Sequence, residues 1–228
     1  MKGDFLKNLM QLLNKQIIVK LSGGKFFEGI LTDIGNDILV LFDGQRFIYI
    51  PLLHVHKIRL SDNINGEIDQ PIEFSLAEQI ESISYRSILT NSKGLLTEIR
   101  VVGDQSLYGY ITNVLNDYLV FYTPVYKTML ISLHHLKWLT LYNSNVNPYT
   151  LNLNIESLPI KLSNAPLQHS LEKQLKEVEG NLVVFDMGKD PDKIGLLKKV
   201  ENNLIELVTE NGETMYLKLT HIKSVHVP

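Results

Sequence analysis

Three histidines occupy one column of a pattern that occurs three times in this chain. His54, His135 and His221 each directly precede an aliphatic residue near the end of a third of the sequence. Imidazole is a common metal ligand, so the column raises the possibility of metal binding. One histidine per repeat does not build a coordination sphere, however. We therefore interpret the three histidines as structural residues that hydrogen-bond nearby backbone at the turn into a strand.

The other residues that could bind a metal or perform catalysis are weaker candidates. Asp186, Asp190 and Asp192 suggest a cation loop, but the segment lacks the glycine and the terminal glutamate of an EF-hand. We interpret it as a solvated hairpin loop. The chain has no nucleophile elbow, paired carboxylates or zinc-protease motif, and its zero cysteines exclude thiol catalysis. The sequence thus predicts a protein that is not an enzyme and has neither cofactor nor metal.

Basic residues gather in the first quarter of the chain. Residues 1–60 hold eight Lys or Arg against five Asp or Glu, whereas the chain as a whole has a net charge of −3. This segment carries the candidate nucleic-acid face, formed by Lys20, Lys25, Arg46, Lys57 and Arg59. Binding driven by counterion release needs several phosphate contacts, and scattered basic residues supply few of them. A mixed-charge surface accounts for these residues equally well.

The histidine column belongs to a longer internal repeat. Gapless copies of one block begin at Ile50, Ile131 and Leu217, and a second block begins 25 or 26 residues upstream of each histidine. The second block opens on Gly29, Gly109 and Gly195. Such self-similarity predicts three units of like structure. We place repeat 1 at residues 1–60, repeat 2 at 75–142 and repeat 3 at 170–228, with linkers at 61–74 and 143–169.

Each repeat predicts a short helix followed by short strands. In repeat 1 the periodicity indicates a helix over about 4–14 and strands at 17–21, 26–33, 37–42, 46–51 and 55–60. Repeat 2 opens on the capping-box pattern of Ser75 and Glu78, and repeat 3 has a helix from Ser170 that stops near Gly180. Alternating apolar residues in 143–169 suggest an extra strand.

The repeated glycines and the small size of each repeat carry structural expectations. A glycine in mid-strand, as at Gly29, Gly109 and Gly195, marks a sharp bend or a close backbone approach. The Asn-Asp or Asn-Asn pairs that follow are typical of tight turns. A unit of about 60 residues buries only a marginal core, so the repeats are expected to pack together. Open strand edges are expected to pair between repeats or between chains.

Repeat 1 resembles the Sm-like family. Residues 19–31 are similar to the first Sm motif, and residues 50–58 overlay the second. The resemblance implies a mainly β chain of three tandem five-stranded small barrels, each preceded by a short α-helix. The ending of each repeat also resembles repeats of spore coat protein B from Bacillus-type bacteria and related Firmicute domains.

The sequence departs from the Sm family at its RNA site. RNA-binding members carry Arg-Gly or Lys-His after the fourth strand, where this chain has Pro51-Leu52, Ser132-Leu133 and Lys218-Leu219. The loop after the second strand holds Asn-Asp in repeats 1 and 2, and an acidic residue there repels phosphate and offers no stacking platform. The resemblance therefore implies the fold with a degenerate RNA site.

These observations favour a non-enzymatic structural or assembly protein. Its expected partner is another protein, or a copy of itself, bound through barrel edges. A more specific form of this hypothesis is that the protein associates with the spore coat. The alternative is an RNA-binding Sm-like protein. The sequence predicts neither a transmembrane segment nor a signal peptide, and we expect a cytoplasmic protein with no membrane partner.

Overall fold

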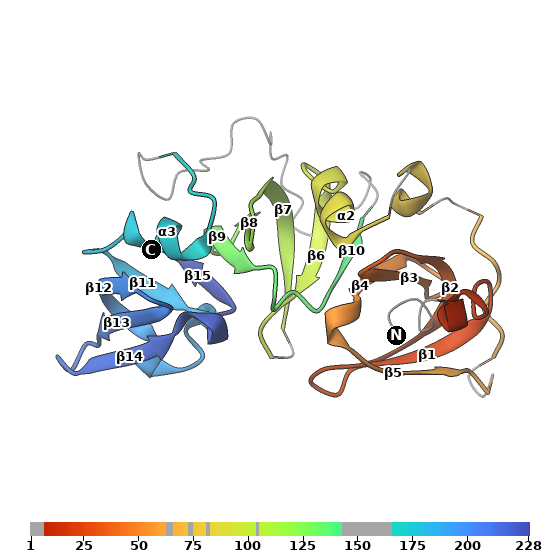
Figure 1. Ribbon diagram of the computed structural model, residues 1–228, viewed down its shortest axis with the longest axis horizontal. Coiled ribbons are helices and arrows are strands. Elements are labelled where there is room, and N and C mark those ends of the chain that lie inside the picture. Colours follow the sequence, from red (N-terminus) through yellow and green to blue (C-terminus); the bar gives the residue numbers. More distant parts are fainter. Residues whose placement is uncertain (1–6, 63–65, 73–74, 81–82, 104, 143–165) are drawn as a thin grey trace. The chain divides into compact units, whose positions relative to one another are not determined.

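A computed structural model describes residues 7–62, 66–72, 75–80, 83–103, 105–142 and 166–228. The chain divides into two compact units. Unit 1 contains residues 1–99 and 137–146, and unit 2 contains residues 100–136 and 147–228. Both are built mainly from antiparallel strands, which confirms the prediction of a mainly β chain (Figure 1). The extra strand predicted within 143–169 lies almost wholly outside the described residues.

Unit 1 is one run of neighbouring strands in the order β6-β10-β4-β3-β2-β1-β5. The strands predicted for repeat 1 are confirmed, each to within one residue at either end. Their tight curl is visible in Figure 1, where they are drawn in red and orange. The bounds are β1 Gln16–Leu21, β2 Phe26–Ile34, β3 Ile38–Phe42, β4 Phe47–Pro51, β5 Val55–Leu60, β6 Leu96–Arg100 and β10 Trp138–Leu141.

Alternating burial explains why these segments are strands. In β1, Ile17, Val19 and Leu21 are fully buried while the residues between them are half-exposed, as a pleated strand with one covered face requires. The buried side chains join those of β2 to β4 in one apolar cluster. Leu9 belongs to the same cluster and lies in a helical segment at residues 7–10, inside the helix predicted from the sequence.

The mid-strand glycines lie where two backbones approach closely. A Cβ atom on Gly29 would lie 2.5 Å from the carbonyl oxygen of Phe42 in β3. Equivalent atoms on Gly109 and Gly195 would overlap the carbonyl oxygens of Tyr122 and Val208. A register shift follows in each second strand, so the strand bends sharply just beyond the glycine.

Unit 2 has the neighbour order β14-β13-β12-β11-β15-β9-β8-β7. Its core joins residues of β8 and β9 to residues of β11 to β15 and to the helix α3. Helix α3 begins after Ser170, as predicted, and the Ser170 hydroxyl accepts a hydrogen bond from the backbone N–H of Lys173. The bounds are β7 Ser106–Val114, β8 Tyr118–Thr123, β9 Lys127–Ser132, α3 Leu171–Lys176, β11 Leu182–Phe185, β12 Ile194–Glu201, β13 Leu204–Val208, β14 Thr214–Lys218 and β15 Ser224–His226.

Short 3₁₀ turns connect several strands. Two of them, η1 (Leu52–His54) and η6 (Leu219–His221), end on a histidine of the repeated column and lead toward the last strand of their repeat. Two others, η4 (Asp186–Gly188) and η5 (Pro191–Lys193), lie between β11 and β12. None of the helices in the described part of the chain is long and apolar enough to cross a membrane.

The helix predicted to open at Ser75 was wrongly placed. Residues Leu76–Gln79 form only a 3₁₀ turn, η2, and the helix of repeat 2 is α2, Tyr85–Asn91. The hydroxyl of Ser75 donates to the carboxylate of Asp33, 3.0 Å away, and does not cap a helix. The capping box is formed instead by Ser84 and Ser87.

We predict that Val225→Asp unfolds unit 2. Val225 is 1% exposed and lies in the core cluster of that unit, so the substitution buries an unpaired charge at a cost of several kcal/mol. Urea unfolding followed by far-UV circular dichroism measures the loss. Leu182→Asp is the matched control, since Leu182 is 61% exposed on the neighbouring strand. Unfolding midpoints equal to wild type in both variants would contradict the placement of β15.

Candidate interaction edges

Strand β10 of repeat 2 adds to the edge of β4 of repeat 1. Leu139 lies opposite Tyr49, and Thr140 lies opposite Ile48. Trp138, at the start of β10, packs into the apolar cluster of unit 1. The edge of β4 is therefore covered by the last strand of the following repeat, and Tyr49 is only 2% exposed.

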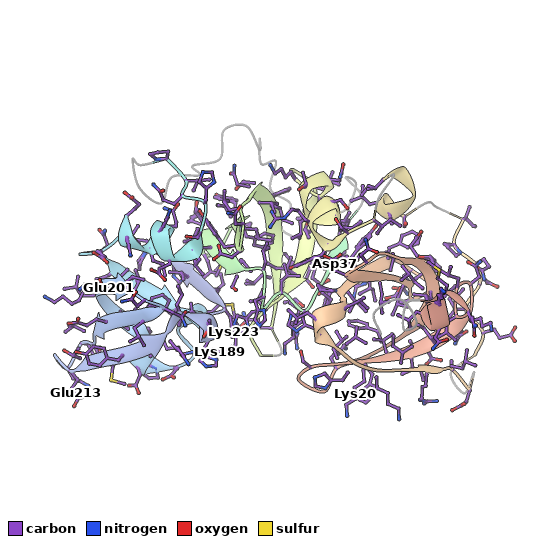
Figure 2. The ribbon with its side chains drawn as sticks, viewed as in Figure 1. Lys20, Asp37, Lys189, Glu201, Glu213 and Lys223 are labelled. Carbon is purple, nitrogen blue, oxygen red and sulfur yellow. The ribbon has the colours of Figure 1, made fainter. Side chains whose placement is uncertain are left out.

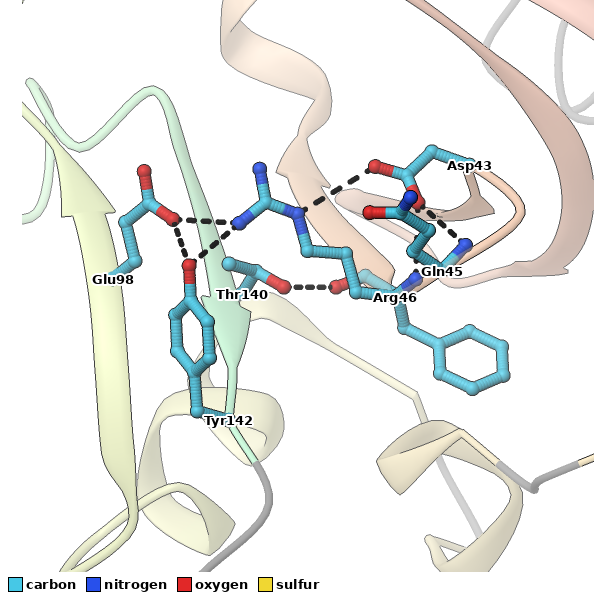
Figure 3. A network of polar contacts seen from close by, with 7 residues as sticks. Asp43, Gln45, Arg46, Glu98, Thr140 and Tyr142 are labelled. Atoms are coloured by element: carbon cyan, nitrogen blue, oxygen red, sulfur yellow. Dashed lines mark hydrogen bonds and ion pairs between the residues drawn. The ribbon is translucent and has the colours of Figure 1, made fainter. Parts of the chain in front are cut away.

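A polar network reinforces this pairing (Figure 3). Arg46 donates through Nη1 to Glu98 Oε2 at 2.8 Å and to the Tyr142 hydroxyl at 2.7 Å, and that hydroxyl donates to the same carboxylate oxygen. Asp43 lies 3.5 Å from Arg46 Nε. Burial alone would lower the pKa of Arg46, but the neighbouring Glu98, Tyr142 and Asp43 raise that pKa above its ordinary value. Arg46 is thus held by partners within its own unit and does not join the other predicted nucleic-acid residues.

One aspartate in each of the first two repeats is hydrogen-bonded to the helix of the following repeat. Asp37 Oδ1 accepts a hydrogen bond from the backbone N–H of Tyr85, the first residue of α2, at 2.7 Å. Asp117 Oδ1 accepts one from Leu171, the first residue of α3, at 2.9 Å. These carboxylates satisfy N–H groups that a helix leaves unpaired at its start. The tight-turn interpretation of the Asn-Asp pairs missed this role; the signal was an acidic residue in the same column of both repeats.

Strand β15 of repeat 3 adds to β9 of repeat 2 in the same way. Val225 lies opposite Leu130, the residue equivalent to Tyr49, so the register matches that of β10 on β4. The N–H of Ser132 donates to the carbonyl oxygen of Lys223 at 3.0 Å. In both of these cases, the fourth strand of a repeat is covered by the last strand of the next repeat.

Side chains of repeat 2 complete the core beneath repeat 3. Tyr118 is fully buried in the cluster of unit 2, where its hydroxyl donates to the carbonyl oxygen of Gln168 and lies 3.1 Å from Gln174 Oε1 in α3. Burial, with a smaller contribution from Asp117, raises the pKa of the Tyr118 phenol to about 12. This junction between repeats is thus both apolar and specifically hydrogen-bonded.

The three histidines of the repeated column lie in three different environments. His54 is buried, with Nδ1 3.1 Å from Ser22 Oγ, whereas His135 Nε2 lies 2.8 Å from the carbonyl oxygen of Thr220. His221 is exposed. Within the described residues no three His, Cys, Asp or Glu side chains gather as a metal site would require.

The interpretation of Asp186 as a solvated loop residue was wrong. Asp186 is 4% exposed and adopts a positive φ of 51°. Its Oδ1 accepts hydrogen bonds from the backbone N–H groups of Lys223 and Ser224, and its Oδ2 pairs with Lys193 at 2.5 Å. The carboxylate therefore fixes the start of β15 beside β11, and its role is structural.

Two strands keep an open edge. Among the described strands β5 neighbours only β1, and β14 neighbours only β13. The covered position Tyr49 is 2% exposed and its equivalent Leu130 is 1% exposed, whereas the third equivalent, Tyr216 in β14, is 70% exposed. Among the strands that the structure describes, the last strand of repeat 1 and the fourth strand of repeat 3 are thus the two members of the pattern that have a neighbour on one side only.

The predicted basic face comes together only in part. Lys20 in β1 lies opposite Lys57 in β5 and opposite Phe26 in β2, which is 56% exposed, and Figure 2 shows Lys20 pointing away from the ribbon. Lys25 is also exposed, and Arg59 pairs with Asp62 at 2.7 Å. The result is a small basic patch with one exposed aromatic ring.

Comparison with known proteins places the chain in a family. The model of the YwrJ third domain matches residues 170–225. The chain is 44% identical over 227 residues to a protein of Bacillus subtilis (strain 168), titled "Uncharacterized protein YwrJ", with 98% of this chain and all of that protein covered. The chain belongs to the YwrJ family. The expected relation to a Firmicute domain of unknown function is thereby confirmed, and the YwrJ match at residues 170–225 falls within repeat 3.

We predict that Asp37→Ala destabilises the protein by about 1 kcal/mol, the usual cost of losing a helix cap. Asp37→Asn should keep most of the stability, because an amide oxygen also accepts the hydrogen bond from Tyr85. Urea unfolding monitored by circular dichroism compares the two variants with wild type. Equal losses in both would show that the negative charge, and not the hydrogen bond, is what matters.

We also predict that unit 2 loses stability on acidification below about pH 6.5. Burial lowers the pKa of His226 and is the largest influence on that of His135, which the neighbouring His134 and Lys223 lower further. A histidine whose pKa is lowered by folding binds its proton more readily in the unfolded state, so protonation favours unfolding by at most about 1.4 kcal/mol per pH unit for each ring. Urea midpoints at pH 7.5 and 5.5 measure the effect. His226→Phe, which keeps the ring contact with Tyr126, should reduce it, and an unchanged pH dependence would exclude His226 as a source.

Proposed function

We propose that this YwrJ-family chain is a non-enzymatic assembly protein that binds other proteins through open strand edges. In this proposal each repeat is one small Sm-like barrel preceded by a helix. The observation that carries the proposal is the contrast between covered and open fourth strands: Tyr49 and Leu130 are buried under a following strand, while Tyr216 is 70% exposed. The chain already uses strand addition twice to join its own repeats.

The chemistry of β14 suits strand addition. Its outer edge presents backbone N–H and C=O groups that a partner strand can satisfy, and such bonds give affinity while side chains select the partner. Two apolar side chains lie exposed beside that edge, Tyr216 and, on β13, Leu204 at 50%. Only Lys218 supplies the charge that usually protects an edge strand. We propose an intracellular setting, with the spore coat as its specific version because of the resemblance to coat protein B.

Nucleic-acid binding remains the second candidate, favoured by Lys20 on β1, which lies between the exposed ring of Phe26 on β2 and Lys57 on β5. Single-stranded nucleic acid is held by stacking on aromatic rings beside cations. The patch is small, however, because Arg46 is bound to Glu98 and Arg59 to Asp62. We therefore rank it below protein binding.

A photo-crosslinking amino acid at position 216 tests the proposed function in Bacillus cells that produce the full chain. We expect a protein adduct at position 216 and a much weaker one at position 182, the matched control. Leu182 is similarly exposed but lies in β11, which is paired on both sides. Mass spectrometry identifies the adduct. Absence of any protein adduct at 216, or an adduct that nuclease removes, would overturn the proposal.

A further inference from the structure

We propose that β14 of one chain pairs with β5 of a second copy of the same chain, with Tyr216 opposite Ile58. This inference rests on the proposed function, since it names the partner of the open edge. It assigns a surface on repeat 3, a surface on repeat 1 and the register that joins them.

The partner follows from the series of strands. The sequence repeat makes β5, β10 and β15 equivalent last strands, and β4, β9 and β14 equivalent fourth strands. Within the chain β10 covers β4 and β15 covers β9. The two members left over are a last strand, β5, and a fourth strand, β14. They are the two complementary halves of a joint that the chain forms twice elsewhere.

The register follows from the same equivalence. Leu139 opposes Tyr49, and Val225 opposes Leu130. The residue equivalent to Leu139 and Val225 is Ile58, and the residue equivalent to Tyr49 and Leu130 is Tyr216. Neighbouring positions then place Lys57 opposite Leu217 and Arg59 opposite Met215.

Burial supports both halves of the proposed joint. Residues of β10 and β15 are almost entirely buried, whereas β5 shows only partial burial at two of its six positions. On the other side β4 and β9 are buried along most of their length, and β14 has no fully buried residue. Leu60 in β5 is 50% exposed and Tyr216 is 70% exposed, so each edge offers apolar surface to the other.

The charges on the open edges of β5 and β14 are also complementary. Strand β5 carries His56, Lys57 and Arg59 on its exposed positions. The turn that leads into β14 carries Glu213, which projects away from the ribbon in Figure 2. In the proposed register Arg59 is the diagonal neighbour of Glu213 across the two strands, a distance that long side chains can span. An opposite-charge pair there favours this register over one shifted by a residue, which would turn the side chains to opposite faces.

The proposed contact is head-to-tail. Such a heterologous joint leaves the opposite edge of each chain open, so the series either closes into a ring or continues. Pairing of β14 with β14 of another copy is the symmetric competitor. The two arrangements bring different residues together, which makes them distinguishable by crosslinking.

The geometry of the existing joint selects the best crosslink. The hydrogen bond from Ser132 to Lys223 makes Ile131 and Ser224 a non-hydrogen-bonded pair, in which Cα atoms lie about 4.5 Å apart. Their equivalents in the proposed joint are Leu217 and Lys57. That spacing is within the range that a disulfide accepts.

The experiment uses two differently tagged full-length chains, one with Lys57→Cys and the other with Leu217→Cys. The natural chain has no cysteine, so every disulfide reports an introduced pair. We expect mild oxidation of the mixture to give a disulfide between the two tags, at least about tenfold more than the pair Ile58→Cys with Leu217→Cys, whose side chains would face opposite ways. Urea present during oxidation should abolish the difference.

Light scattering of the cysteine-free protein provides the second measurement. We expect the average molar mass to rise with concentration beyond that of one chain. Tyr216→Lys should reduce this rise, because it replaces the apolar ring opposite Ile58 with a charge. Leu182→Lys is the control that should leave the mass unchanged.

Each contrary result has a separate meaning. A monomer at all concentrations with no tag-to-tag disulfide overturns self-association, and the photo-adduct at position 216 then decides independently whether the proposed function survives. A disulfide between two Leu217→Cys chains alone overturns the head-to-tail register and supports the symmetric pairing.

Discussion

The structure depends on one constraint, the need to satisfy the backbone of an edge strand. A β-strand at the end of a small sheet exposes a row of N–H and C=O groups, and a repeat of about 60 residues has little core with which to tolerate that exposure. This chain meets the constraint by laying the last strand of one repeat on the fourth strand of the repeat before it. Trp138 and Tyr118 show that the same joints carry core residues, so strand pairing and burial of apolar surface occur together.

Polar groups at each joint select its register. Asp37 and Asp117 receive the first N–H of the following helix, and Arg46 bridges β4 to the carboxylate of Glu98, which is 4% exposed. A buried carboxylate without a partner is costly, so a slipped strand would lose more than its apolar contacts. Burial of apolar side chains therefore holds each joint together without fixing its register, and the hydrogen-bonded polar groups form only when the strands are in one register.

Local patterns in the sequence predicted the strands well, because alternation, mid-strand glycines and turn residues act over a few neighbours. The helix of repeat 2 was misplaced for the opposite reason. The Ser75 pattern is that of a capping box, but the hydroxyl is held by Asp33, which lies 42 residues away in the chain. Arg46 and Asp186 were misjudged likewise, since their partners, Glu98 and Lys223, come from distant segments. The repeat itself held the unused information: equivalent positions that differ in character, such as Tyr49, Leu130 and Tyr216, mark where a partner is present or missing.

The differences among equivalent positions also indicate how strong an external joint can be. Val40 and Val120 are fully buried in repeats 1 and 2, whereas repeat 3 has Glu206 at that position, opposite Tyr216. A permanent joint over Glu206 would remove a carboxylate from water, which costs several kcal/mol unless a cation accompanies it. In the proposed register Lys57 and Arg59 of β5 would lie on the opposite face from Glu206. As exposed charges they would attract that carboxylate only weakly and would be screened by salt. The composition of the two open edges therefore favours a proposed association that is weaker and more reversible than the joints within the chain.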